Sequence, residues 1–161
     1  MHKSSYDCMV NFVHKYCGEF FNGISTPGTV VDIGSQDVNG TYAPLFKNWK
    51  YIGVDAVAGR NVDKIMISEF NTGLPDNSAD LVISGQCLEH CRNPFKLVAE
   101  MHRVTSDLCI IVAPFIWKEH RYPVDCWRFL PDGMRCLLED AGFKVLETCL
   151  SGSDCWGVGQ K

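Results

Sequence analysis

The sequence lacks the features that would direct the chain to a membrane or to a nucleic acid. Its longest apolar run, residues 108–117, is far shorter than the about 20 residues that cross a bilayer, and Pro114 interrupts it. There is no stripe of Lys and Arg, and the formal net charge is -4. Because a duplex-binding protein needs clustered cations to displace counterions from phosphates, we expect neither a membrane nor a nucleic acid as the main partner.

The N-terminus lacks the unbroken apolar core of a signal peptide. Asp7, Asn11 and Lys15 lie between its apolar residues. The sequence therefore predicts a cytoplasmic protein.

No Cys-x-x-Cys pair occurs, although nine cysteines are many for 161 residues. Their number is odd, and most have apolar neighbours in the sequence. This pattern favours reduced, buried thiols over the alternatives, which are a disulfide framework and a zinc site.

Two common phosphate-binding loops are also missing, namely G-x-G-x-x-G and G-K-S/T. Residues 30–40 instead read VVDIGSQDVNG, in which Gly34 allows close approach to a ligand and Gly40 permits the next turn. Without the paired glycines of a pyrophosphate site, a nucleoside with a cationic, amino-acid-like tail fits this loop better, because Asp32 and Asp37 can meet the positive charge.

The length suits one domain with a substantial core. Residues 1–23 are predicted as a helix with Ser4 or Ser5 as its cap and an apolar face that extends to Phe20 and Phe21, and the core is expected over residues 28–160. Asn22-Gly23 and Pro27-Gly28 break the chain between them. Two more helices are predicted to begin at Pro94 and Pro131, with Asn93 capping the first and Gly142 ending the second. Strands are predicted over residues 29–33, 50–54, 62–67, 80–84, 108–113, 143–150 and 155–159.

Strands that alternate with helices and end in a hairpin predict a doubly wound α/β sheet with an antiparallel edge. Ligands of such sheets bind outside the carboxyl ends of the strands, and Asp32, Asp55 and residues 84–86 all fall at those ends. Asp55 follows Asp32 at the spacing typical of an acid that binds ribose hydroxyls. The alternative is that Asp55 only caps the turn that follows it.

Four segments together resemble the ordered motifs of class I S-adenosylmethionine-dependent methyltransferases, and most closely the small methyltransferase-domain group of type 11. They are residues 30–42 (VVDIGSQDVNGTY), 51–63 (YIGVDAVAGRNVD), 74–90 (LPDNSADLVISGQCLEH) and 119–143 (EHRYPVDCWRFLPDGMRCLLEDAGF). The resemblance covers about residues 28–160. It implies one Rossmann-like domain whose seven strands follow the order 3-2-1-4-5-7-6, with an antiparallel last strand.

The resemblance also implies S-adenosylmethionine as cofactor and assigns roles by position. Gln36 departs from the commoner motif, which has glycine there. The implied contacts are Asp32, Gly34, Ser35 and Gln36 to the methionine part, Asp55 to the ribose, Glu69 and Phe70 beside the adenine, and Ser84, Gly85 and Gln86 beside the sulfonium.

Methyl transfer to oxygen or nitrogen needs an aligned nucleophile, and a base if that nucleophile is protonated. The segment after the fifth strand matches the family pattern H-x-x-P-x-D-x-W-R. Here His120 is the candidate base, and Asp125 is its orienting partner or a substrate acceptor. Arg128 is the candidate anchor for an anionic group, with Tyr122 and Trp127 beside the substrate. Alternatively, Asp125 and Arg128 form a structural ion pair and Trp127 fills the core.

The sequence predicts no metal, although two metal sites stay open as alternatives. Some quinone O-methyltransferases carry Glu-x-x-Glu-His, which binds a divalent cation, but Gln86 replaces the first Glu of that pattern. Cys87, His90 and Cys91 share a helix face and would form a zinc cluster.

Adenine-N6 and cytosine-C5 methylation are not supported, because Ser84-Gly85-Gln86-Cys87 replaces their motifs. We therefore predict a methyltransferase that acts on a small molecule, with oxygen favoured over nitrogen, while the sequence leaves the oligomeric state open. The alternatives are a non-catalytic cofactor-binding or partner-binding module of the same fold and, less favoured, a nucleotide-dependent oxidoreductase.

Overall fold

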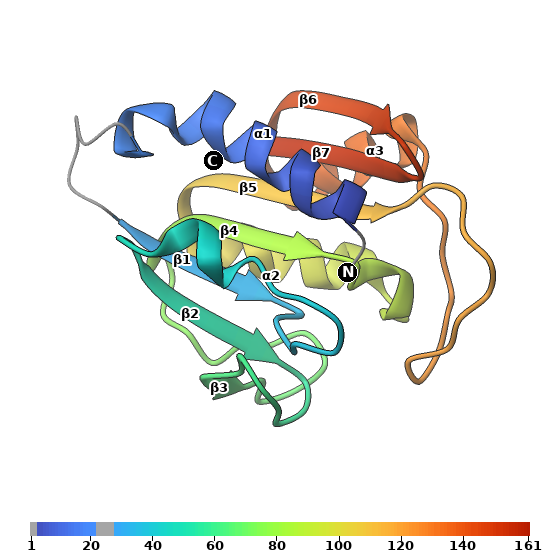
Figure 1. Ribbon diagram of the computed structural model, residues 1–161, viewed down its shortest axis with the longest axis horizontal. Coiled ribbons are helices and arrows are strands. Elements are labelled where there is room, and N and C mark those ends of the chain that lie inside the picture. The colour runs from blue at the N-terminus through green and yellow to red at the C-terminus, as the bar shows by residue number, and fades with distance from the viewer. Residues whose placement is uncertain (1–2, 22–27) are drawn as a thin grey trace.

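The computed structural model describes residues 3–21 and 28–161 (Figure 1). The predicted break at Asn22-Gly23 and Pro27 lies outside the described residues, as do the side chains of Phe20 and Phe21. Helix α1 (Lys3–Phe21) begins before both predicted cap residues. Ser5 is therefore not a cap but a buried residue inside the helix, which corrects the prediction.

Seven strands form one sheet, in the order β3-β2-β1-β4-β5-β7-β6 (Figure 1). The first five strands in this order are parallel, and β7 runs antiparallel to both β5 and β6. The predicted strand order and antiparallel hairpin are confirmed. The strands are β1 (Thr29–Ile33), β2 (Lys50–Asp55), β3 (Lys64–Ile65), β4 (Ala79–Gly85), β5 (Thr105–Pro114), β6 (Lys144–Ser151) and β7 (Asp154–Gln160).

The third strand is shorter than predicted. Only Lys64 and Ile65 pair with β2, whereas the apolar pattern of residues 62–67 predicts a longer strand. Ile67 is 71% exposed, and its N–H donates to the carbonyl of Asn71 in a turn instead of continuing the sheet. Ile65 and Ile67 therefore face solvent, whereas Met66 is half-buried and packs against the core.

The sheet separates two apolar cores, one on each face. On one face, α1 and the short helix η1 (Ala43–Phe46) pack on the sheet, and the rings of Phe12 and Trp156 stack with centroids 4.8 Å apart. On the other face lie α2 (Pro94–Val104) and α3 (Pro131–Ala141), where Met101 and Leu138 are fully buried.

Local signals determine where these two helices begin and end. The Asn93 side chain accepts from the N–H of Lys96, and Pro94 begins the first turn of α2. Gly142 ends α3 at a φ of 101°, a left-handed conformation that favours glycine. The predicted cap, start and stop are confirmed. Within the described residues, no helix is long and apolar enough to cross a membrane.

Candidate active site

A cavity of about 620 Å³ opens at the carboxyl ends of β1, β2 and β4. Its volume is in the range of sites that enclose small organic ligands. From the loops after these strands, the cavity extends beneath the irregular segment 115–130, so it joins the two regions that the sequence singled out. Of the predicted site residues, Asp32, Gly34, Ser35, Gln36, Asp55, Glu69, Gly85, Gln86, His120 and Tyr122 line it.

The loop after β1 requires glycine at position 34. Gly34 has a φ of 84°, and a Cβ there would lie 2.5 Å from the Cβ of Cys87. The N–H of Gly34 donates to the carbonyl of Val54 at 2.9 Å, which ties the loop to the neighbouring strand. The backbone at this position thus approaches the cavity without a side chain between them.

Asp32 lies at the base of the cavity and is almost fully buried. Its Oδ2 accepts from the hydroxyl of Tyr51 at 2.6 Å, and that hydroxyl accepts from the amide of Asn61 at 2.8 Å. Burial raises the pKa of Asp32 to about 7, even though the Tyr51 hydrogen bond opposes the shift. Neither Tyr51 nor Asn61 is predicted from the sequence, because the contact of Tyr51 with Asp32 depends on how β1 and β2 pair and Asn61 joins it through the Tyr51 hydroxyl.

The carboxylate of Asp55 serves the loops on both sides of it. Oδ2 accepts from the N–H of Gln36 at 3.0 Å, and Oδ1 accepts from the N–H of Val57 at 3.2 Å. The structure therefore supports the alternative interpretation, in which Asp55 caps the turn that follows it. A carboxylate has about four acceptor sites, so two such bonds leave room for a ligand in the cavity.

Gln86 lies at the cavity, but its side chain amide is committed elsewhere. With a φ of 57°, Gln86 places Nε2 where it donates to Ser5 Oγ at 3.1 Å and to Asp154 Oδ1 at 3.0 Å. The Ser5 hydroxyl donates in turn to Asp154 Oδ2 at 2.6 Å. This buried network connects α1 and β7 to the end of β4.

Gly85 is held against a residue that the sequence analysis did not single out. A Cβ on Gly85 would lie 2.3 Å from the hydroxyl of Tyr42, so this tyrosine packs directly on the end of β4. The Tyr42 hydroxyl is buried and has no hydrogen-bond partner among the described residues. Tyr42 also lines the cavity, where it forms part of the wall next to the loop after β1.

Two of the predicted cofactor contacts are not among the residues that line the cavity. Ser84 is fully buried, and its hydroxyl donates to the carbonyl of Ile33 at 2.8 Å. Phe70 packs against the core, with the ammonium of Lys96 5.6 Å from its ring centre. Glu69 does line the cavity and forms an ion pair with Arg92 at 3.2 Å.

The segment between β5 and α3 is organised around Asp125. Its carboxylate receives both Nη atoms of Arg128, at 2.6 and 2.8 Å, and the N–H of His120 at 2.7 Å. These contacts hold the pKa of Asp125 well below its usual range, chiefly through Arg128. Arg128 also donates to the carbonyls of Trp117, Lys118 and Trp127. The Arg128 guanidinium therefore holds the segment in shape. This agrees with the alternative in which Asp125 and Arg128 form a structural ion pair.

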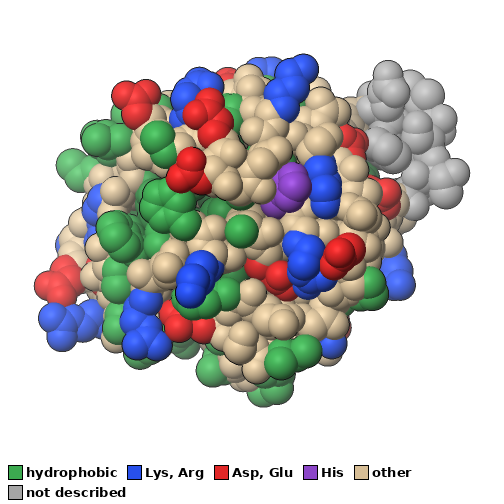
Figure 2. Space-filling model, turned by 180° about the vertical axis from the view of Figure 1, so that it is seen from behind, with side chains coloured by type: hydrophobic (Ala, Val, Ile, Leu, Met, Phe, Trp, Pro, Cys, Tyr) green, Lys and Arg blue, Asp and Glu red, His purple; other side chains and the backbone are tan. Residues whose placement is uncertain are grey.

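Trp127 does not fill the core, contrary to that same alternative. The side chain is 42% exposed, and Nε1 donates to the carbonyl of Cys91 at 2.8 Å. Together with Phe95 and Leu130, Trp127 and Arg128 border a second, shallow hollow outside the main cavity. Figure 2 shows hydrophobic side chains gathered on that side of the face covered by α2 and α3.

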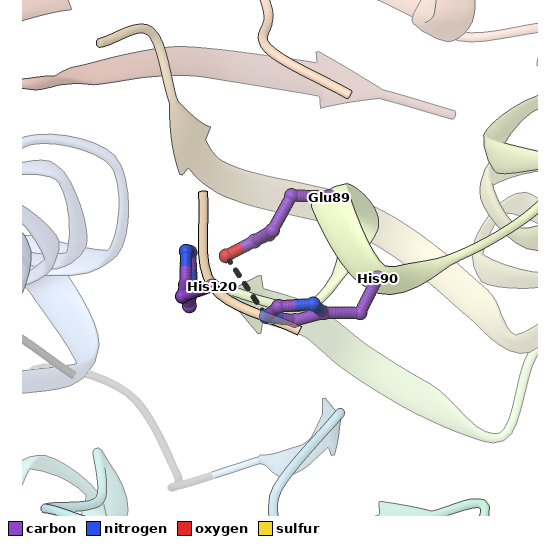
Figure 3. A group of neighbouring side chains, drawn as sticks. All are labelled: Glu89, His90 and His120. Carbon is purple, nitrogen blue, oxygen red and sulfur yellow. Dashed lines mark ion pairs between the residues drawn. The ribbon is translucent and has the colours of Figure 1, made fainter. Parts of the chain in front are cut away.

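Glu89, the acid of the Glu-x-x-Glu-His alternative, lines the cavity, although it was not among the predicted site residues. It follows Leu88 in the short helix η2 (Leu88–His90), and neither carboxylate oxygen has a hydrogen-bond partner among the described residues. Glu89 is fully buried, and its carboxylate points toward the rings of His90 and His120 (Figure 3). Burial raises the pKa of Glu89 to about 8 and lowers that of His90. Its only signal in the sequence was the incomplete Glu-x-x-Glu-His pattern, which does not include His120.

The cysteines are not all buried, contrary to the expectation from the sequence. All nine cysteines are free, and Cys126 and Cys136 are exposed. Cys87, His90 and Cys91, the conceivable zinc cluster, do not come together as a ligand group. Within the part of the chain that the structure describes, the group of His, Cys, Asp and Glu close enough to share an ion is Glu89, His90 and His120.

Comparison with known proteins adds a family model and several solved structures. A model described as a methyltransferase domain matches residues 32–112. No curated protein sequence matches the chain.

Three solved structures illustrate the likeness of fold. A methyltransferase from Burkholderia thailandensis, 1,6-didemethyltoxoflavin-N1-methyltransferase with bound 1,6-didemethyltoxoflavin and S-adenosylhomocysteine, has a TM-score of 0.75 at 14% identity, covering 99% of this chain and 79% of its own. A SAM-dependent methyltransferase from Aquifex aeolicus has a TM-score of 0.63 at 18% identity, covering 99% and 98%. A possible histamine N-methyltransferase from Thermotoga maritima has a TM-score of 0.65 at 18% identity, covering 97% and 99%.

Proposed function

The chain belongs to the class I S-adenosylmethionine-dependent methyltransferases, and from this premise we propose that it O-methylates a small hydroxylated molecule bound beneath residues 115–130. The observation that carries the proposal is the continuity of one cavity. The same hollow is lined by Asp55 at one end and by His120 and Tyr122 at the other. A cofactor held at the strand ends thus has space for an acceptor beside it.

The residues at the strand ends fit the cofactor. Gly34 gives the cavity a bare stretch of backbone, and a Cβ there would collide with Cys87. Asp55 retains acceptor capacity for ribose hydroxyls, and we assign Asp32 and Gln36, which line the same cavity, to the amino-acid end and Glu69 to the adenine side. S-adenosylmethionine supplies a methyl carbon already activated for displacement, and the negative charge of Asp55 favours its cationic form over a neutral nucleoside.

The acceptor end has a different character from the cofactor end. Trp117 and Tyr122 contribute aromatic surface, and Lys118 contributes a cation. Such walls suit a flat, hydroxylated molecule that stacks on one ring. The enzyme's task is then to align an oxygen nucleophile and to exclude water from the space around it.

His120 is the group we assign to activate the acceptor. Its Nδ1 lies 3.2 Å from the carbonyl of Lys118 and 3.4 Å from Oδ2 of Asp125, so a proton on Nδ1 leaves the Nε2 lone pair for the acceptor. Asp125 is a positioning residue, because it holds His120 through the backbone N–H. An alcohol or phenol must lose a proton as it attacks, and Nε2 is placed to accept it.

This built-in acceptor for a proton is what favours oxygen over nitrogen. A neutral amine attacks with its own lone pair and loses its proton afterwards, so it needs no base for the attack itself. Two of the neighbouring folds carry N-methyltransferase names, so the acceptor test must include both classes. The aromatic lining leads us to place phenols first in that test.

One experiment tests cofactor and acceptor separately. Calorimetry with S-adenosylmethionine, S-adenosylhomocysteine and NAD should give binding of the first two and none of NAD. Release of S-adenosylhomocysteine is then followed with matched pairs of phenols and anilines, and with glycans and lipid head groups. We expect turnover with the phenol and not with its aniline partner. Turnover with the aniline alone would transfer the proposal from oxygen to nitrogen, and tight binding of NAD alone would end it.

A further inference from the structure

Methyl transfer as proposed uses His120 but does not explain why two more ionisable side chains gather beside it. We propose that Glu89, His90 and His120 form a binding site for one divalent transition-metal ion, with Zn²⁺ as the reference ion, at the acceptor end of the cavity. The site comes from two parts of the chain, with Glu89 and His90 on η2 and His120 on the segment beside it (Figure 3).

The first argument is the isolation of the Glu89 carboxylate. Both of its oxygens are buried and neither has a hydrogen-bond partner among the described residues. A buried carboxylate of this kind is costly unless a cation or a donor is close. The nearest ring nitrogen is Nε2 of His90, 3.6 Å from Oε1.

The second argument is the orientation of the two imidazoles. Nδ1 of His90 lies 2.6 Å from the carbonyl of Val124, so it carries the proton and donates it there. Nδ1 of His120 faces the carbonyl of Lys118 in the same manner. Both rings are thus left with a lone pair on Nε2, and outer-shell carbonyls that set a histidine tautomer in this way are typical of metal ligands. Two lone pairs and a carboxylate meeting in one place repel one another unless a cation lies between them.

The distances suit an ion after a small closing movement. The three ligand atoms lie within 4.8 Å of one another, and the two rings meet at 85° with centroids 4.9 Å apart. Zinc bonds of about 2.0–2.2 Å place the ligands of a tetrahedral site roughly 3.4 Å apart. The His120 side chain is 37% exposed and sits on a segment without helix or strand, so it is the ligand best able to move inward.

This ligand set differs from both metal patterns that the sequence raised. Gln86, which replaces the first acid of Glu-x-x-Glu-His, turns its amide to Ser5 and Asp154. His120 supplies the third ligand from 30 residues further along the chain, where no local motif reveals it. Two nitrogens and one oxygen suit zinc and its transition-metal neighbours, whereas Mg²⁺ and Ca²⁺ prefer oxygen ligands.

Three protein ligands leave a coordination position open, as in catalytic zinc sites. The three residues also line the cavity, so the open position faces the acceptor space. An acceptor oxygen bound there would be acidified by the ion. This last role rests on the proposed function, and it changes the part played by His120, since Nε2 as a ligand no longer takes the proton.

Metal binding is measured on the full chain without cofactor or acceptor. After treatment with a chelator and its removal, equilibrium dialysis against Zn²⁺ should give one ion per chain. Glu89→Gln and His120→Ala should each weaken binding by roughly 100-fold or more, since loss of an outer-shell partner alone costs about 10- to 100-fold. Glu119→Gln and His14→Ala are the matched controls, because neither residue belongs to the group, and they should bind like the parent.

A spectrum identifies the ligands, which matters in a chain with nine thiols. Co²⁺ in the site should show visible absorption without the ultraviolet band of a thiolate ligand, and Cys87→Ser and Cys91→Ser should leave it unchanged. Absence of bound Zn²⁺, a thiolate band, or unchanged affinity in both Glu89→Gln and His120→Ala would each overturn the metal site. Circular dichroism of Glu89→Gln verifies folding, and His120→Ala, altered on a partly exposed residue, provides the second variant.

The same samples separate this inference from the proposed function. Calorimetry with S-adenosylhomocysteine reports the cofactor site alone. Failure of the full chain to bind Zn²⁺, with cofactor binding and phenol methylation intact, would refute the metal site and leave the methyltransferase proposal standing. Zn²⁺ binding with no methyl transfer to any acceptor would do the reverse.

Discussion

Arg128 forms a bidentate ion pair with Asp125, in which Nη1 donates to Oδ1 at 2.6 Å and Nη2 donates to Oδ2 at 2.8 Å. Two-pronged pairs of this kind fix orientation as well as distance. Because Asp125 also accepts from the N–H of His120, the pair determines where the proposed activating group lies. The acceptor end of the cavity is thus shaped by a charge network in an irregular segment.

We expect Arg128→Ala to loosen this segment. The Asp125 side chain is 2% exposed, so loss of its partner should lower the free energy of unfolding by about 1–3 kcal/mol. Trypsin should then cleave faster at Lys118 and Arg121. Arg128→Lys should recover only part of the loss, since an ammonium cannot make both bonds in one plane. Arg121→Ala is the control, as its exposed pair with Glu119 contributes less than about 1 kcal/mol.

Asp55→Ala should abolish most cofactor affinity. A carboxylate that accepts from ribose hydroxyls contributes about 2–3 kcal/mol, which corresponds to roughly 30- to 150-fold in the dissociation constant of S-adenosylhomocysteine. Asp55→Asn retains the shape of the turn and should still lose affinity. Asp140→Ala, an exposed acid on α3, should bind normally. Calorimetry that gives equal affinities for all four proteins would remove Asp55 from the ribose role.

His120→Ala should separate cofactor binding from turnover. The ring lies at the acceptor end of the cavity, so affinity for S-adenosylhomocysteine should change less than threefold while turnover falls by roughly 10²- to 10⁴-fold. His14→Ala, a variant on the exposed side of α1, should retain full turnover. Unchanged turnover in His120→Ala with the best acceptor would place the activating group elsewhere.

Asp32 should make stability depend on pH in the cofactor-free protein. Burial raises its pKa from the ordinary 3.8 to about 7, so the folded state holds a proton that the unfolded state releases. The stabilisation is complete below about pH 4 and is lost as pH rises through 7, with a slope of at most one proton, about 1.4 kcal/mol per pH unit. Asp32→Asn should lack this contribution.

Urea unfolding between pH 5 and 8 checks the Asp32 prediction. The difference in unfolding free energy between the parent and Asp32→Asn should change across this range. Tyr51→Phe should extend the change to higher pH, because the Tyr51 hydroxyl donates to the charged form. A difference that stays constant with pH would show that Asp32 is ionised throughout.

Much of the fold followed from the sequence because buried strands and capped helices leave local patterns. The run at 29–33 is β1 to the residue, and Asn93-Pro94 and Gly142 begin and end helices where expected. The strand predicted over residues 62–67 is longer than the strand observed, because Ile65 and Ile67 lie at an exposed edge of the sheet. Apolar pattern alone does not distinguish an edge residue from a core residue.

Site residues were harder to place than strands, for a physical reason. Position at a strand end identified Asp32, Gly34 and Asp55, since main-chain direction sets where such residues lie. Whether the other predicted residues reach the cavity depends on the direction of their side chains. Ser84, for example, turns its hydroxyl to a carbonyl within the sheet. The grouping of Glu89 with His120 was not predicted, because the chain brings these residues close only after folding.

The segment above the cavity is anchored mainly to η2 and its neighbours. The N–H of Cys126 donates to the carbonyl of Glu89, His90 bonds to Val124, and Trp127 bonds to Cys91. These bonds join residues 87–91 and 115–130 into one structural unit at the proposed acceptor end of the cavity. A transplant of both pieces into a related enzyme should carry its selectivity along, whereas either piece alone would arrive without the surface that shapes it.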